Sequence, residues 1–96
     1  MTMHYILFCE DKPDSEPLRL ATRERHLAWA ADQADVIHLA GAMLSDDGEH
    51  MLGSVFILNL DSEEAARAFT SEDPYTQAGL WGNVIIRPFR QALPKL

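Results

Sequence analysis

The sequence predicts a small α+β fold built on an antiparallel sheet. Four apolar segments have the length and composition of strands, and two longer segments carry apolar residues at helical spacing. These six segments follow one another in the order β-α-β-β-α-β. Two right-handed crossovers then place both helices on the same side of the sheet. This arrangement is the ferredoxin-like, or split βαβ, fold.

The first strand and the first helix are separated by a turn. Residues 3–10 alternate as a strand with apolar side chains on both faces, which is typical of a strand covered on both sides. Residues 11–15 favour a turn, and Asp14 or Ser15 could cap the following helix. We expect this helix over residues 16–34. Its core-facing side chains are expected to be those at helical spacing, namely Leu20, Leu27, Ala31 and Ala34.

The rest of the chain supplies three strands and a second helix. The strands are expected over residues 36–44, 51–60 and 83–89, the first two joined by a polar loop. Ser62 and the acidic residues after it predict the start of a helix that reaches about Glu72. Pro74 then ends this helix or begins an extra turn. Pro88 predicts that the last strand lies at a sheet edge or contains a bulge.

The composition fits one globular domain over residues 1–96. The chain is 47% hydrophobic, and its formal net charge is -7. Its Lys and Arg residues form no run, so we expect neither nucleic acid nor an anionic membrane as a partner. No apolar run approaches the roughly 20 residues of a membrane span. The lone Cys9 excludes an internal disulfide, and a cytoplasmic location is the resulting expectation.

Both faces of the predicted sheet carry apolar side chains. Ile6 and Phe8 point away from Leu7, and the same alternation recurs in the strands around Phe56 and Ile85. With both helices on one side, such a face exceeds what a soluble monomer usually exposes. We therefore expect a homodimer packed through the sheet faces, because burial contributes about 1.5–3 kcal/mol for each large apolar side chain.

His26 is the histidine whose position indicates chemistry. It lies about 100° from the centre of the expected core stripe, so one ring edge would be buried while the other met solvent or a ligand. Arg23 precedes it by three residues and lies on the same side of the helix. Asp73 follows the second helix and could orient the imidazole, which leaves the other ring nitrogen as a base. Alternatively, Asp73 caps a helical turn beginning at Pro74, and the two roles can coexist.

Three further side chains are candidate substrate-binding groups. Ser54 could donate to a substrate oxygen, although serine beside glycine more often bonds to the local backbone. Tyr5 and Tyr75 could line a pocket, with core packing as the alternative for Tyr5. The sequence shows no metal-ligand spacing, phosphate loop or dinucleotide fingerprint. We therefore expect no metal and no cofactor.

Several segments occur in a characteristic order: Tyr5-Ile-Leu-Phe-Cys9, Asp11-Lys-Pro13, Arg23-Glu-Arg-His26-Leu27, Leu39-Ala-Gly41, Gly53-Ser54-Val55, Asp73-Pro-Tyr75-Thr-Gln-Ala-Gly79 and Val84-Ile-Ile-Arg-Pro88-Phe89. Over nearly its whole length the chain thus resembles the YciI-like (YCII-related) family. The resemblance implies a dimeric α/β barrel and an active site centred on His26 and Asp73. The chain departs at Gly41-Ala42-Met43, where the family often has Gly-Pro. The family has no single established reaction, and some relatives are implicated in dehydrochlorination of hydroxylated aromatics.

These observations favour a cofactor-independent enzyme of the lyase or isomerase type. His26, oriented by Asp73, would transfer a proton on a small oxygenated or aromatic-derived substrate. Arg23 would hold a substrate oxygen or carboxylate beside the base. The alternative is a non-catalytic protein that binds a small molecule or dimerises, in which the bond between the two side chains is structural. A metal-assisted oxygenase of the same superfold would need two or three convergent ligands.

Overall fold

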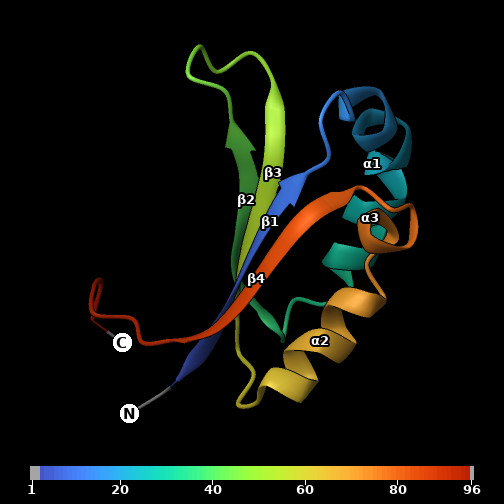
Figure 1. The fold of residues 1–96 in the computed structure, drawn as a ribbon. Coiled ribbons are helices and arrows are strands. Elements are labelled where there is room, and N and C mark those ends of the chain that lie inside the picture. The colour runs from blue at the N-terminus through green and yellow to red at the C-terminus, as the bar shows by residue number, and fades with distance from the viewer. Residues whose placement is uncertain (1–2, 96) are drawn as a thin grey trace.

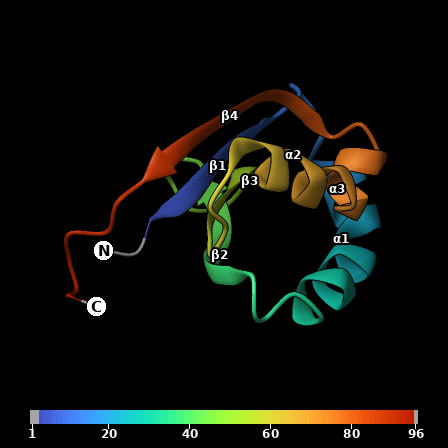
Figure 2. The same cartoon turned by 90° about the horizontal axis from the view of Figure 1, so that it is seen from below.

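The computed structural model describes residues 3–95 and contains four strands and three helices (Figure 1). In chain order these are β1 (His4–Asp11), α1 (Glu16–Ala31), β2 (Ile37–Leu44), β3 (Met51–Leu58), α2 (Glu63–Ser71), α3 (Pro74–Gln77) and β4 (Trp81–Phe89). The strands form one antiparallel sheet in the order β2-β3-β1-β4. All the helices lie on one side of it, as the two views in Figures 1 and 2 show. The predicted ferredoxin-like α+β fold is therefore confirmed.

Local signals account for most of the element bounds. The hydroxyl of Ser62 accepts the Ala65 N–H and caps α2, as its position predicts. Ser15 precedes α1, but its hydroxyl donates to the Pro13 carbonyl and does not cap the helix. Pro88 lies in β4, which is an edge strand of the sheet. An edge strand has no neighbour on its outer side, so it tolerates a residue without a backbone N–H.

The predicted core stripe of α1 is wrong. All four of its residues are exposed, the two leucines to 55% and 47%: Leu20, Leu27, Ala31 and Ala34. The face that packs inward instead carries residues spaced by three and four: Arg19, Thr22, His26 and Trp29. α1 therefore turns a mostly polar face towards the sheet. Apolar periodicity marks the wrong face here because the inward residues are held by hydrogen bonds and ring contacts rather than by aliphatic packing.

Trp29 of α1 is half-buried and packs against the core. Its ring centroid lies 4.8 Å from that of Phe69 in α2. The indole joins the last turn of α1 to α2. This contact fixes how the two helices approach one another, and thereby where the end of α2 meets α1.

The core lies between the sheet and α2. Its buried members come from three strands and α2: Tyr5, Leu7, Cys9, Phe56, Leu58, Ala66, Phe69 and Ile86. The Cys9 thiol is fully buried, and burial, with a smaller contribution from the nearby Asp73 carboxylate, raises its pKa to about 12. A thiol in this state is a packing group and not a nucleophile.

The sheet face opposite the helices is apolar and only partly covered. Cross-strand register brings Ile6 opposite Ile57, and Phe8 opposite Val55 and Ile85, on this face. Ile85 is 39% exposed in the chain. Dimerisation through this apolar surface stays a prediction.

Glu16 ties the β2–β3 hairpin to the start of α1. One carboxylate oxygen lies 2.8 Å from Nδ1 of His50, and the other accepts the Met51 N–H at 2.9 Å. The Met51 and His50 hydrogen bonds lower the pKa of Glu16, while the bond to Glu16 raises the pKa of His50. The contact between Glu16 and His50 is therefore strongest at a pH that lies between the lowered pKa of Glu16 and the raised pKa of His50.

We expect this contact to weaken at both ends of that pH range. The raised His50 pKa contributes stability that is complete below the ordinary histidine pKa and is lost as pH rises through the raised value. The lowered Glu16 pKa contributes stability that is present above the ordinary glutamate pKa and is lost as pH falls through the lowered value. An NMR titration should show a lower His50 pKa in Glu16→Gln than in the wild type. Equal values would contradict this prediction.

Candidate functional site

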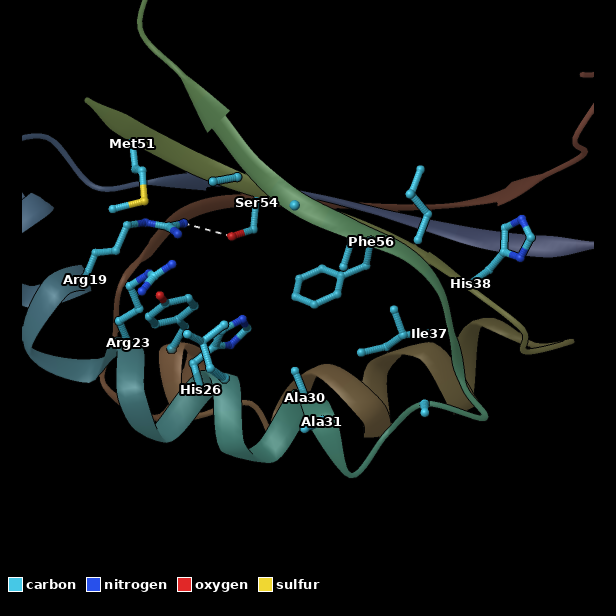
Figure 3. A pocket seen from close by; sticks show the side chains of 17 residues that line it. Arg19, Arg23, His26, Ala30, Ala31, Ile37, His38, Met51, Ser54 and Phe56 are labelled. Atoms are coloured by element: carbon cyan, nitrogen blue, oxygen red, sulfur yellow. Dashed lines mark hydrogen bonds between the residues drawn. The ribbon is translucent and has the colours of Figure 1, made fainter. Parts of the chain in front are cut away.

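A cavity of about 600 Å³ lies between α1 and the strands β2 and β3 (Figure 3). Its volume is in the range of pockets that bind small molecules. The polar side chains in its wall come from α1, β2, β3 and α3: Arg19, Arg23, His26, His38, Ser54 and Tyr75. Phe56 and small residues of α1 and β2 supply an apolar wall. The cavity therefore suits a small molecule with a flat apolar body and a few oxygen atoms.

His26 and Asp73 meet in this wall. Nδ1 of His26 lies 2.8 Å from Oδ1 of Asp73. The histidine side chain is 12% exposed and that of Asp73 only 1%. Because a carboxylate only accepts hydrogen bonds, this contact favours the tautomer with its proton on Nδ1, in which Nε2 holds the free electron pair. The geometry thus leaves a proton-accepting nitrogen on a side chain that lines the cavity.

Asp73 also caps α3. Its Oδ1 accepts the Tyr75 N–H at 2.9 Å, next to Pro74 at the start of the helix. Both roles considered for Asp73 are therefore present in the structure. The cap holds the carboxylate in place, and a fixed carboxylate holds the imidazole.

Aromatic rings fix the plane of the imidazole. The ring of Tyr75 stacks on His26 with centroids 4.0 Å apart and an interplanar angle of 15°. The ring of Phe56 meets the imidazole edge to face, with the two ring centroids 6.2 Å apart. The ring of Trp29 is tilted against it, with the centroids 6.0 Å apart. With Nδ1 bonded to Asp73, these contacts leave the ring little freedom to turn.

Arg19 is a residue of the site that the sequence interpretation missed. Its Nε and Nη2 donate to the two oxygens of Asp11 at 2.8 and 3.0 Å, and Nη2 also donates to Oγ of Ser54 at 2.8 Å (dashed line in Figure 3). Its guanidinium carbon lies 4.7 Å from the centroid of the Tyr75 ring. The available signal was spacing, because Arg19 precedes His26 by two helical turns and so shares its face.

The two arginines of the cavity differ in their charge environment. Asp11 pairs with Arg19 through two parallel hydrogen bonds, which neutralise it within the protein. Arg23 is exposed, and no carboxylate in residues 3–95 forms an ion pair with it. Arg23 is thus the cation available to an anionic ligand at the cavity mouth.

The structure brings together all the predicted site residues except one. His26, Asp73, Arg23, Ser54 and Tyr75 lie in or against the cavity wall. Tyr5 does not line it, because it is buried in the core on β1. Its alternative role, core packing, is the one that the structure shows. The substrate-binding role predicted for Tyr5 therefore has no support in the fold.

Over residues 3–95, no three His, Cys, Asp or Glu side chains lie together so that they could hold a metal ion. Within the same residues, no helix has the length and apolar character needed to cross a bilayer.

Comparison with known proteins relates this chain to a family. Residues 3–90 match the model of the YCII-related domain. An uncharacterized protein of Haemophilus influenzae is 35% identical over 96 residues, which covers 93% of this chain and 98% of that protein. Protein YciI of Escherichia coli is 33% identical over 100 residues, with the same two coverages.

A solved structure extends the comparison. The chain is similar to TftG, the 5-chloro-2-hydroxyhydroquinone dehydrochlorinase of Burkholderia phenoliruptrix, whose structure contains 2,5-dihydroxybenzoquinone. The TM-score is 0.84 and the identity 26%, with 93% of this chain and 95% of that chain covered. A hypothetical Arabidopsis thaliana protein shares the fold alone, with a TM-score of 0.53, 13% identity and coverages of 99% and 92%. These matches confirm the predicted family resemblance and agree with the predicted ferredoxin-like α+β fold, and the chain belongs to the YCII-related family.

Proposed function

We propose that this chain is an enzyme that transfers a proton on a small oxygenated ring compound, with His26 as the general base. The observation that carries the proposal is the 2.8 Å bond between Nδ1 of His26 and Asp73 beside the cavity. That bond sets the tautomer, so that Nε2 accepts the proton. Asp73 orients the ring and stabilises the imidazolium that forms.

Elimination of HX and isomerisation both suit one base with one free nitrogen. In an elimination, Nε2 takes a proton from the substrate, and the electron pair left behind forms the new double bond. The group X leaves with its own bonding pair as X⁻, and His26 then passes the proton to solvent. In an isomerisation, His26 returns the proton to a different carbon. Neither route needs a group beyond the side chains named here, and we propose that the reaction is cofactor-independent.

The charge of the cavity supports an oxygenated, anionic substrate. Arg23 is the cation at its mouth that has no carboxylate partner in the described chain, so it could pair with a phenolate, enolate or carboxylate. The similarity to TftG, a dehydrochlorinase crystallised with a dihydroxyquinone, supports the same class. We propose a hydroxylated aromatic or quinone-like ring as the substrate and elimination as the reaction.

Asp73→Asn tests the role of Asp73. Asparagine can offer an N–H to Nδ1, which would move the ring proton to Nε2 and remove the base. We expect kcat to fall by at least tenfold while KM changes less. The ¹⁵N shifts of His26 should show the Nδ1-protonated tautomer in the wild type and a loss of that tautomer in the variant. The same tautomer and the same kcat in both proteins would contradict the proposal.

A non-catalytic, small-molecule-binding protein is the second candidate. The observation that favours it is the second bond of Asp73 Oδ1, to the Tyr75 N–H, because a cap alone would explain a buried carboxylate here. A cap does not explain why an imidazole with a free nitrogen faces a cavity. If His26 is structural, its removal should unfold the chain, and if it is the base, a folded and inactive protein should result.

The assembly and location of the protein belong to the same proposal. We propose that residues 1–96 act as a single domain and form a homodimer through the sheet face that carries Phe8, Val55 and Ile85. We also propose a cytoplasmic location, with neither nucleic acid nor a membrane as partner. Sedimentation of the purified protein would give the mass of the assembly directly.

A further inference from the structure

The cavity contains two hydroxyl groups that donate no hydrogen bond to any group in residues 3–95. They belong to Ser54 of β3 and Tyr75 of α3, both of which line the cavity. Both side chains are buried. The Tyr75 oxygen forms no hydrogen bond within those residues, yet it is not among their fully sealed, unbonded polar atoms, which are His4 Nδ1, Trp29 Nε1 and Asp73 Oδ2. The Ser54 oxygen accepts one hydrogen bond, from Arg19, and its own hydrogen has no acceptor there. Buried hydroxyls normally find an acceptor. The open space next to these two is the cavity itself.

The hydroxyl of Ser54 has its direction set by Arg19. Nη2 of Arg19 lies 2.8 Å from Oγ, and a guanidinium can only donate. Oγ therefore uses a lone pair on that side, and its own hydrogen must point elsewhere. A charged donor on the oxygen also polarises the O–H and makes it a stronger donor.

The hydroxyl of Tyr75 has its position set by the contacts of its ring. His26 stacks on the ring at 4.0 Å, and the guanidinium of Arg19 lies 4.7 Å from its centroid. Burial raises the Tyr75 pKa, against the opposing effect of Arg19 and Arg23. The phenol therefore stays protonated and remains a donor over the whole neutral range.

We propose that the hydroxyls of Ser54 and Tyr75 form an oxygen-binding subsite for a carbonyl, enolate or phenolate oxygen on a small planar ring. This inference rests on the proposed function and names the part of the substrate that the site holds. When His26 removes a proton, negative charge develops on an oxygen conjugated with the reacting carbon. Donors that are already oriented stabilise that charge without first having to reorganise. Arg23 supplies positive charge at the mouth of the cavity, whereas these hydroxyls hold the substrate oxygen in a defined orientation inside it.

Ser54→Ala and Tyr75→Phe each delete one of these hydroxyls with little change of shape. With 2,5-dihydroxybenzoquinone as the probe, calorimetry should show Kd raised about tenfold in each variant, as for a lost hydrogen bond to a charged oxygen. Tyr5→Phe is the matched control, because it deletes the phenol outside the cavity and should leave Kd unchanged. Thermal melting of each variant checks that the fold is kept.

A second measurement follows the hydroxyl directly. The chain has two tyrosines, so ¹³Cζ labelling yields one signal from Tyr75 and one internal reference from Tyr5. The Tyr75 signal should shift when the probe binds, while that of Tyr5 stays in place. If the wild type binds the probe but both hydroxyl deletions bind it equally well and the Tyr75 signal does not move, the subsite is overturned and the proposed function stands. If the wild type does not bind the probe, both fail.

Discussion

His26→Ala is expected to lower kcat by about 10²–10⁴ and to leave the fold intact, because general base catalysis contributes a factor of this size. The His26 ring is held at one edge by the bond to Asp73 and on its face by the ring of Tyr75, and it adds little to the aliphatic core. Turnover is measured on the compound that the wild type converts, chosen from chlorinated hydroxyhydroquinones, lactones and muconate-like acids. Circular dichroism and thermal melting report on the fold.

His50→Ala is the matched control for this substitution. It also removes an imidazole bonded to a carboxylate, but on an exposed hairpin outside the cavity. We expect normal kcat in that variant. A folded His26→Ala protein with unchanged turnover would rule out the base, and an unfolded one would favour the structural role.

Asp11→Ala is expected to destabilise the chain by about 3–5 kcal/mol, because it leaves the buried guanidinium of Arg19 without its counter-ion. Side chains at both ends of this ion pair are at least 95% buried, and the guanidinium would retain only the Ser54 oxygen as an acceptor. A domain of this size has a total stability of about 5–15 kcal/mol. Urea denaturation measures the loss as a lower midpoint.

Glu63→Ala provides the comparison for the buried pair. It breaks the ion pair with Arg67 on the surface of α2, where the side chains are 54% and 66% exposed. Its expected cost is below about 1 kcal/mol, because water screens exposed charges. Equal losses in the two variants would show that Arg19 is solvated in solution and does not depend on Asp11.

Most of the fold could be predicted from local signals. Alternating apolar residues define each strand, the Ser62 cap marks the start of α2, and Pro88 indicates an edge strand. The element order alone then restricts the topology to one with both helices on one side of the sheet. The same logic predicted that the end of α2 could reach the middle of α1, where His26 and Asp73 are found.

The cavity could not be predicted from local sequence signals, because it depends on which face α1 presents to the sheet. Hydrophobic periodicity indicated the face of Leu20 and Leu27, whereas the structure turns Arg19 and His26 inward. A buried arginine becomes favourable only when distant groups supply its partners, and Asp11 and Ser54 lie 8 and 35 residues away from it.

Tyr5 and Tyr75 show the same division between local and tertiary information. Their residue type allows both core packing and pocket lining, and the sequence cannot distinguish these roles. The sheet register places Tyr5 in the core, while the turn capped by Asp73 places Tyr75 against His26. By itself the sequence determined the order and type of the elements and the family, because these depend on short-range patterns. Only the tertiary structure decided which polar side chains share the cavity, because their hydrogen-bond partners come together only when the chain is folded.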